Sequence, residues 1–183
     1  MNLKQWFNKG MTYEQYQQHM QVNKDEMLSI YERFTIDESL QQDIKKMSMK
    51  QIDVIVITED WCGDALVNIP ILMKIAAETN MKVRFILRDE NLELMDQYLT
   101  NGTARAIPIF IFIDSNGNEQ AVWGPRADYI QQIVDAERNK LPAKESSDYK
   151  ERQDEMIKNL KERYMEDEQL WNIISQSIFS RLL

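Results

Sequence analysis

The segment at residues 58–70, TEDWCGDALVNIP, decides how the chain is expected to fold, and it holds Cys62, the only cysteine. A β-branched apolar run at residues 52–57, IDVIVI, precedes it and predicts a strand buried on both faces. From Gly63 to about Thr79 the apolar residues recur at helical spacing. The cysteine is therefore expected where a buried strand passes into a helix.

The pattern outward from this segment predicts a mixed sheet. The expected elements after it are a strand over 83–87, a helix over 92–99, strands over 107–114 and 119–124, and a helix over 126–139. Strand, helix, strand in succession implies parallel pairing with a right-handed crossover. Asn116-Gly117 is a strong hairpin signal, so the last two strands are expected to be antiparallel. The sum is an α/β fold with a central mixed sheet and helices on both faces.

Helical extensions are expected at both ends. Helical spacing covers residues 12–33 and 37–47, and a linker at 141–147 precedes a long charged helix over about 148–168 and a more apolar final segment. The expected division is an N-terminal helical extension (1–50), a core (51–140) and a C-terminal helical extension (141–183). One apolar stripe runs through that last part: Met156, Leu160, Tyr164, Leu170, Trp171, Ile174, Ile178 and Leu182. It either packs against the chain's own core, the favoured interpretation, or forms a face for a partner protein.

Composition excludes several classes of function. The net charge of −8 would repel phosphate backbones and anionic lipid, so neither nucleic acid nor a membrane is expected as a partner. The first residues lack the apolar segment of a signal peptide, and one cysteine forms no internal disulfide, which together favour a cytoplasmic protein. With one histidine, His19, and one cysteine, no zinc site is expected, and no glycine-rich phosphate loop or cofactor motif occurs.

Four features around Cys62 together resemble the thioredoxin superfamily. Trp61-Cys62-Gly63 follows the strand as the WCGPC signature does in thioredoxin, and Pro70 lies where thioredoxins carry a helix-kinking proline. Ile107-Pro108 resembles the segment that bears the family's cis-proline, and the Asn-Gly hairpin matches its closing strands. The resemblance covers roughly residues 51–140. It implies a thioredoxin-like fold in which Cys62 is the nucleophile and Trp61, Gly63, Ile107 and Pro108 bind an extended substrate.

The departures from the family pattern concern the chemistry. Ala65 stands where thioredoxins have their second cysteine, Val56 replaces a buried aspartate, and Asp64 replaces the intervening proline. A mixed disulfide at Cys62 then has no internal thiol to resolve it. The resemblance therefore implies monothiol exchange with a protein disulfide or a low-molecular-weight thiol, or thiol sensing. The alternative is a non-catalytic adaptor that binds an extended peptide or a partner protein, with contacts from the C-terminal helices.

The groups expected near Cys62 have opposite effects on the pKa of its thiol. A helix N-terminus favours the thiolate, whereas carboxylates on Glu59, Asp60 and Asp64 each oppose it by roughly 0.4–0.9 pKa units at about 7 Å. Asp64 has an equal claim to a purely structural role in the first helical turn. Arg105 either assists a substrate at the site or pairs with nearby acids.

Overall fold

One four-stranded mixed sheet lies at the centre of the computed structural model, which describes residues 2–183. Its order is β2-β1-β3-β4, formed by β1 (Ile52–Thr58), β2 (Val83–Leu87), β3 (Ile109–Asp114) and β4 (Glu119–Trp123). β1 pairs with β2 in parallel and with β3 antiparallel, and β3 pairs antiparallel with β4. The predicted mixed sheet and its hairpin are confirmed.

The two central strands are buried on both faces, which the sequence predicts for β1. Every residue of β1 except Asp53 is buried, and so is every residue of β3 except Asp114. In the register of these strands, Val54 faces Phe112 and Val56 faces Phe110. At roughly 25 cal/mol per Å² of buried apolar surface, such strands contribute much of the hydrophobic stabilisation.

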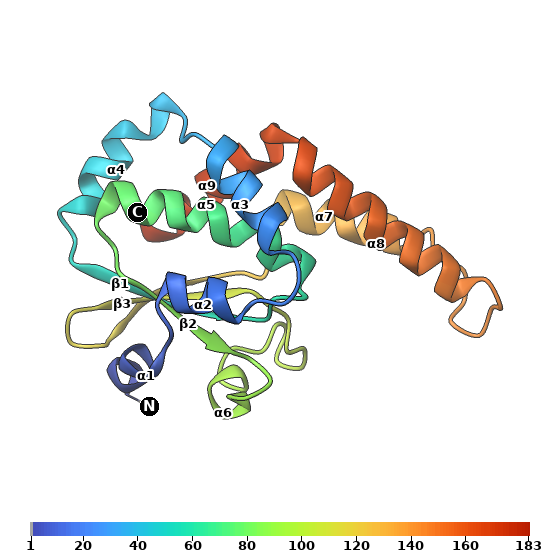
Figure 1. Cartoon of the computed structure of the whole chain (residues 1–183), viewed down its shortest axis with the longest axis horizontal. Coiled ribbons are helices and arrows are strands. Elements are labelled where there is room, and N and C mark those ends of the chain that lie inside the picture. The colour runs from blue at the N-terminus through green and yellow to red at the C-terminus, as the bar shows by residue number, and fades with distance from the viewer. Residues whose placement is uncertain (1) are drawn as a thin grey trace.

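Helices cover both faces of the sheet (Figure 1). They are α1 (Leu3–Lys9), α2 (Tyr13–His19), α3 (Lys24–Arg33), η1 (Glu38–Leu40), α4 (Gln41–Ser48), α5 (Gly63–Thr79), α6 (Leu92–Met95), α7 (Asp128–Arg138), α8 (Tyr149–Glu166) and α9 (Glu168–Leu182). α3, α4 and α9 gather around α5 on one side, while α1 and α6 lie on the other. α5 therefore runs through the middle of a helical layer, which explains why its apolar residues extend around most of its circumference.

The N-terminal extension protects an edge of the sheet. Met11 and Phe85 exchange two backbone hydrogen bonds of 2.9 Å, so the segment between α1 and α2 pairs with the outer side of β2. Tyr16 stacks on Phe85 with ring centroids 4.7 Å apart. An uncovered strand edge is a template for aggregation, and this pairing covers the edge of β2 at Phe85.

The C-terminal extension contributes to the same hydrophobic core. Within the predicted stripe, Tyr164, Leu170, Trp171, Ile174, Ile178 and Leu182 are buried. α9 packs against α5 and β4, and Trp123 donates a 2.9 Å hydrogen bond to Ser177. The favoured interpretation of the stripe, packing against the chain's own core, is confirmed for these residues. The first turns of α8 project away from the sheet beside α7.

Three predicted boundaries are wrong in detail. The helix expected over 92–99 ends at Met95, because the backbone bonds after it tighten to three-residue spacing at Gln97 and Tyr98. The strand expected from 107 begins at Ile109. The charged C-terminal helix stops at Glu166, and Asp167 (φ −88°, ψ 89°) separates it from α9. α1 has no counterpart among the predicted elements.

Candidate functional site

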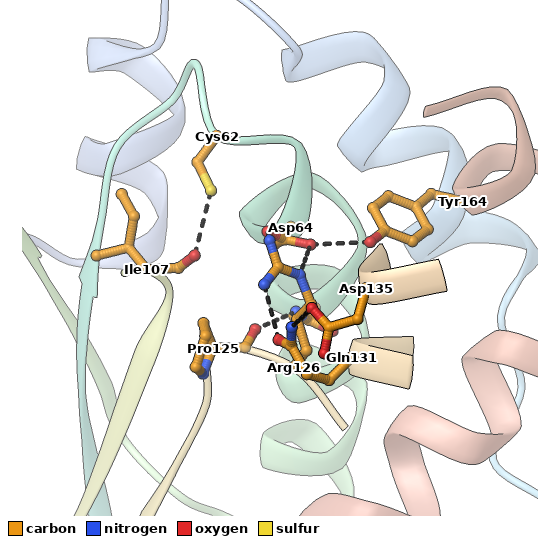
Figure 2. Close-up of polar contacts among 9 residues, drawn as sticks. Cys62, Asp64, Ile107, Pro125, Arg126, Gln131, Asp135 and Tyr164 are labelled. Atoms are coloured by element: carbon orange, nitrogen blue, oxygen red, sulfur yellow. Dashed lines mark hydrogen bonds and ion pairs between the residues drawn. The ribbon is translucent and has the colours of Figure 1, made fainter. Parts of the chain in front are cut away.

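Cys62 is the N-cap residue of α5, at the junction that the sequence predicts. β1 ends at Thr58, a short turn follows, and the helix begins at Gly63. The Cys62 side chain points back toward the sheet, where its Sγ donates a 3.4 Å hydrogen bond to the carbonyl oxygen of Ile107 (Figure 2). Cys62 is 8% exposed, so the sulfur lies at the boundary between the core and the surface.

The segment opposite the sulfur has an unusual backbone. The Ile107–Pro108 peptide bond is cis, and so is the Gly124–Pro125 bond nearby. Ile107 and Pro108 are both buried. Gly124 has φ 126°, a conformation that L side chains rarely adopt, and it packs directly against the carbonyl of Pro108. The loop before β3 and the loop after β4 therefore support one another beside Cys62.

The environment of Cys62 opposes ionisation of the thiol. Burial, followed by the negative charge of Asp64, raises the pKa of Cys62 to about 11. The backbone N–H groups of Ala65 and Asp64 and the charge of Arg126 act in the opposite direction, toward a lower pKa. The thiol is therefore almost entirely protonated at neutral pH, although it lies at a helix N-terminus.

Asp64 forms a polar network with two distant parts of the chain (Figure 2). The Nε and Nη2 atoms of Arg126 donate to its two carboxylate oxygens at 2.8 and 2.6 Å. The hydroxyl of Tyr164, on α8, donates to Asp64 Oδ1 at 2.9 Å. The side chains of Asp64 and Arg126 are 13% and 14% exposed, so the ion pair is largely removed from solvent. The bidentate geometry is the strong form of this interaction.

Charge pairing changes the acid–base behaviour of both donors. Burial by itself would lower the pKa of Arg126, but the charge and hydrogen bonds of Asp64 outweigh it and raise that pKa. Burial, reinforced by the charge of Asp64, raises the pKa of Tyr164 well above its ordinary value. Both side chains therefore remain protonated donors across the physiological range, and Asp64 is held by a cation and a hydroxyl.

The other residues singled out near Cys62 serve different contacts. Trp61 is 52% exposed, and the guanidinium of Arg88 lies 4.9 Å from its ring centroid. Asp60 Oδ2 accepts the backbone N–H of Gln21 at 2.7 Å, so it fixes the chain between α2 and α3. Apart from its chain neighbours and its own helix, no heavy atom described here lies within 4 Å of a Cβ built on Gly63. The surface on this side of Cys62 is open.

Arg105 and Glu59, two of the charged residues expected near Cys62, form structural contacts elsewhere. Arg105 forms a bidentate ion pair with Asp96, at 2.7 and 2.9 Å, on an exposed part of the surface. Glu59 is buried and accepts the backbone N–H of Asp89 at 2.8 Å, and burial raises its pKa. Of the interpretations open for Arg105, this geometry favours pairing with a nearby acid.

Sequence reasoning missed most of the network around Asp64. No sequence pattern placed Arg126 beside Asp64, and Tyr164 was named only as a member of the apolar stripe. Gln131, whose side-chain oxygen accepts a 2.9 Å hydrogen bond from Arg126 Nη1, was not among the predicted site residues. Tyr164 lies 100 residues from Asp64 along the chain. The tyrosine hydroxyl within the apolar stripe was the only signal in the sequence, because a buried hydroxyl needs a partner.

Within residues 2–183, no group of three or more metal-ligating side chains is placed to hold an ion. None of the helices in that range has the length and apolar character needed to span a bilayer.

Comparison with solved structures supports the fold. An HIV epitope-scaffold is 15% identical over 97% of this chain and 96% of its own, with a TM-score of 0.67. PA1234, a protein of unknown function from Pseudomonas aeruginosa, is 14% identical over 97% of this chain and 99% of its own, with a TM-score of 0.66. No curated protein matches the sequence. A family model described as thioredoxin matches residues 10–140, and the chain therefore belongs to the thioredoxin family.

Proposed function

We propose that the protein carries out monothiol exchange through Cys62. The observation that carries this proposal is the position of the sulfur: on the N-cap residue of α5, 3.4 Å from the carbonyl oxygen of Ile107, with open surface beside Gly63. Backbone N–H groups at a helix N-terminus stabilise a thiolate. The backbone before Pro108 supports pairing with an extended substrate, as in related thioredoxins.

The reaction is a thiolate displacement. The Cys62 thiol loses its proton to solvent, and the thiolate attacks one sulfur of a substrate disulfide. A bond forms between Cys62 Sγ and that sulfur, the substrate S–S bond breaks, and the second sulfur leaves as a thiolate that takes up a proton. Because Ala65 has no sulfur, a second attack must come from an external thiol, which regenerates Cys62 and releases the substrate group as a new mixed disulfide.

The raised pKa of Cys62 gives this exchange a particular character. The thiolate fraction at neutral pH is small, so the first attack is slow. A thiol of high pKa is also a poor leaving group. Attack on the partner's sulfur of a mixed disulfide must expel Cys62 as a thiolate, so this step is expected to be slow and the mixed disulfide to persist. These properties favour capture of a disulfide partner over rapid turnover.

A second function is favoured by the same burial. A thiol that is 8% exposed and has a pKa of about 11 suits a structural role, in which the thioredoxin fold binds an extended peptide without covalent chemistry. In that adaptor, Trp61 supplies an exposed aromatic contact, and the projecting part of α8 supplies a surface for a partner protein.

Trapping with a small disulfide separates the two functions. Wild type and Cys62→Ser are incubated with oxidised glutathione at pH 8.5, and the adduct is measured by intact-protein mass spectrometry. Monothiol exchange predicts one glutathione per wild-type chain, none on Cys62→Ser, and removal of the adduct by added thiol. Wild type that stays unmodified after prolonged incubation rejects exchange and supports the adaptor.

A further inference from the structure

The C-terminal helix α8 reaches Asp64, two residues from Cys62, through the side chain of Tyr164. Tyr164 lies in its last turns, is 4% exposed, and donates its hydroxyl to Asp64. Its backbone carbonyl accepts a 2.7 Å hydrogen bond from the indole N–H of Trp171, which is buried in α9. The tyrosine is therefore fixed at both its backbone and its hydroxyl, and it cannot easily swing away from Asp64.

Arg126 is fixed in a comparable way. It precedes α7, and while Nε and Nη2 hold Asp64, Nη1 donates to Gln131 at 2.9 Å. Gln131 in turn donates to Asp135 at 2.8 Å along α7. The carboxylate of Asp64 is consequently oriented from two places outside the turn that carries Cys62: the segment just before α7, which holds Arg126, and α8, which holds Tyr164.

We propose that Tyr164 and Arg126 are positioning residues for Cys62, acting through the orientation and charge of Asp64. Asp64 is two residues from the thiol, and a bare carboxylate there would oppose loss of the thiol proton. Arg126 offsets that charge, and the Tyr164 hydroxyl disperses part of what remains. The C-terminal extension thereby sets how readily Cys62 reacts, which deepens and rests on the monothiol function proposed above.

Other charged and titratable groups face the thiol and stay constant in the test. They are Tyr16 on α2 and Glu59 and Asp60 in the turn after β1. Asp60 is engaged by backbone N–H groups near Gln21, and Glu59 by that of Asp89. Among residues 2–183, none of these three side chains forms a hydrogen bond with Arg126 or Tyr164, so substitutions in the Asp64 network leave them in place.

The test measures the rate constant for alkylation of Cys62 by iodoacetamide at pH 8, well below its pKa. Asp64→Asn removes the opposing charge and is expected to react about 3–10 times faster than wild type, whereas Arg126→Met is expected to react about 3–10 times slower. Tyr164→Phe is expected to react about twofold slower, because the hydroxyl carries only a partial charge. Tyr149→Phe, on the same helix but outside the network, is the matched control and should react like wild type.

A merely structural role gives the opposite sign for two of these variants. If Tyr164 and Arg126 only hold the fold together, their loss loosens the site and exposes Cys62, and alkylation becomes faster. A double variant, Asp64→Asn with Tyr164→Phe, tests the route: the effect of Tyr164→Phe should vanish once Asp64 is uncharged. If Tyr164→Phe slows alkylation equally in both backgrounds, or leaves it unchanged in wild type, the inference is overturned.

Two further comparisons separate a folding defect, and a failure of monothiol exchange, from a failure of the positioning role. If Arg126→Met unfolds, as judged by circular dichroism, the Asp64→Asn/Arg126→Met pair removes both charges and is expected to fold and to alkylate within about twofold of wild type. Alkylation requires no disulfide substrate. Shifted alkylation rates with no glutathione adduct would therefore reject monothiol exchange and retain the positioning role, and the reverse result would reject the positioning role alone.

Discussion

Opposing influences meet at the Cys62 sulfur. Backbone N–H groups of α5 and the cation of Arg126 favour the thiolate, while burial and the carboxylate of Asp64 favour the thiol. Burial is the largest of these, because a charge loses its hydration when it leaves water. The charges were visible in the sequence at Asp60, Asp64 and Glu59, but the degree of burial depends on how Ile107 and Pro108 pack over the turn. Sequence reasoning could therefore locate the thiol without fixing its pKa.

Alkylation of Cys62 should remain slow at neutral pH and accelerate far into the alkaline range. Because only the thiolate reacts, the rate constant is expected to rise about tenfold per pH unit between pH 7 and 10, without a plateau. The same chain in denaturant is the control, since its exposed thiol has a pKa of about 8.5 and its rate levels off above that pH. A plateau for the folded protein below pH 9 would contradict the raised pKa.

At the scale of elements, the site is an encounter of three chain segments that are far apart in sequence. The turn before α5 supplies Cys62, the loop before β3 supplies Ile107, and the loop after β4 supplies Gly124. The strand-to-helix turn and the hairpin follow from local patterns, namely the change from a period of two to 3.6 and the Asn-Gly pair. The contact between Gly124 and Pro108 has no local signature beyond the glycine itself.

Gly124→Ala should destabilise the protein far more than Gly63→Ala. A Cβ on Gly124 would collide with the carbonyl oxygen of Pro108 and lie 3.2 Å from Ile109 Cα, in a backbone conformation with φ 126°. The expected loss in the free energy of unfolding is on the order of 3 kcal/mol. Gly63 has open space, so its alanine variant should be unchanged or up to about 1 kcal/mol more stable. Urea unfolding followed by circular dichroism measures both, and equal losses would contradict the close approach.

At the scale of the whole molecule, the helical extensions take part in the structure of the core. The N-terminal segment pairs with β2 through Met11, and the C-terminal helices reach Asp64 through Tyr164 and cover α5 through α9. The apolar stripe at helical spacing predicted that α9 is amphipathic and buried. It could not predict which surface α9 covers, because helix packing depends on contacts between residues distant in sequence. For the same reason the Arg126 and Tyr164 contacts with Asp64 emerged only in three dimensions.

Trp171 provides the sharpest test of that integration. Its side chain is 1% exposed and packs edge-on against Phe34, with ring centroids 6.4 Å apart. The guanidinium carbon of Arg33 lies 4.9 Å from the centroid of the Trp171 ring. Trp171→Ala should lower the free energy of unfolding by about 3–5 kcal/mol, since it leaves a large cavity and frees the carbonyl of Tyr164. Ile157→Ala, at a position on α8 that is 54% exposed, is the control and should change the free energy of unfolding by less than about 0.5 kcal/mol. If the C-terminal helices were instead an independent appendage, Trp171→Ala would leave the unfolding of the sheet unchanged and remove only a separate early transition. Urea titrations monitored by far-UV circular dichroism and by the accessibility of Cys62 would resolve the two transitions.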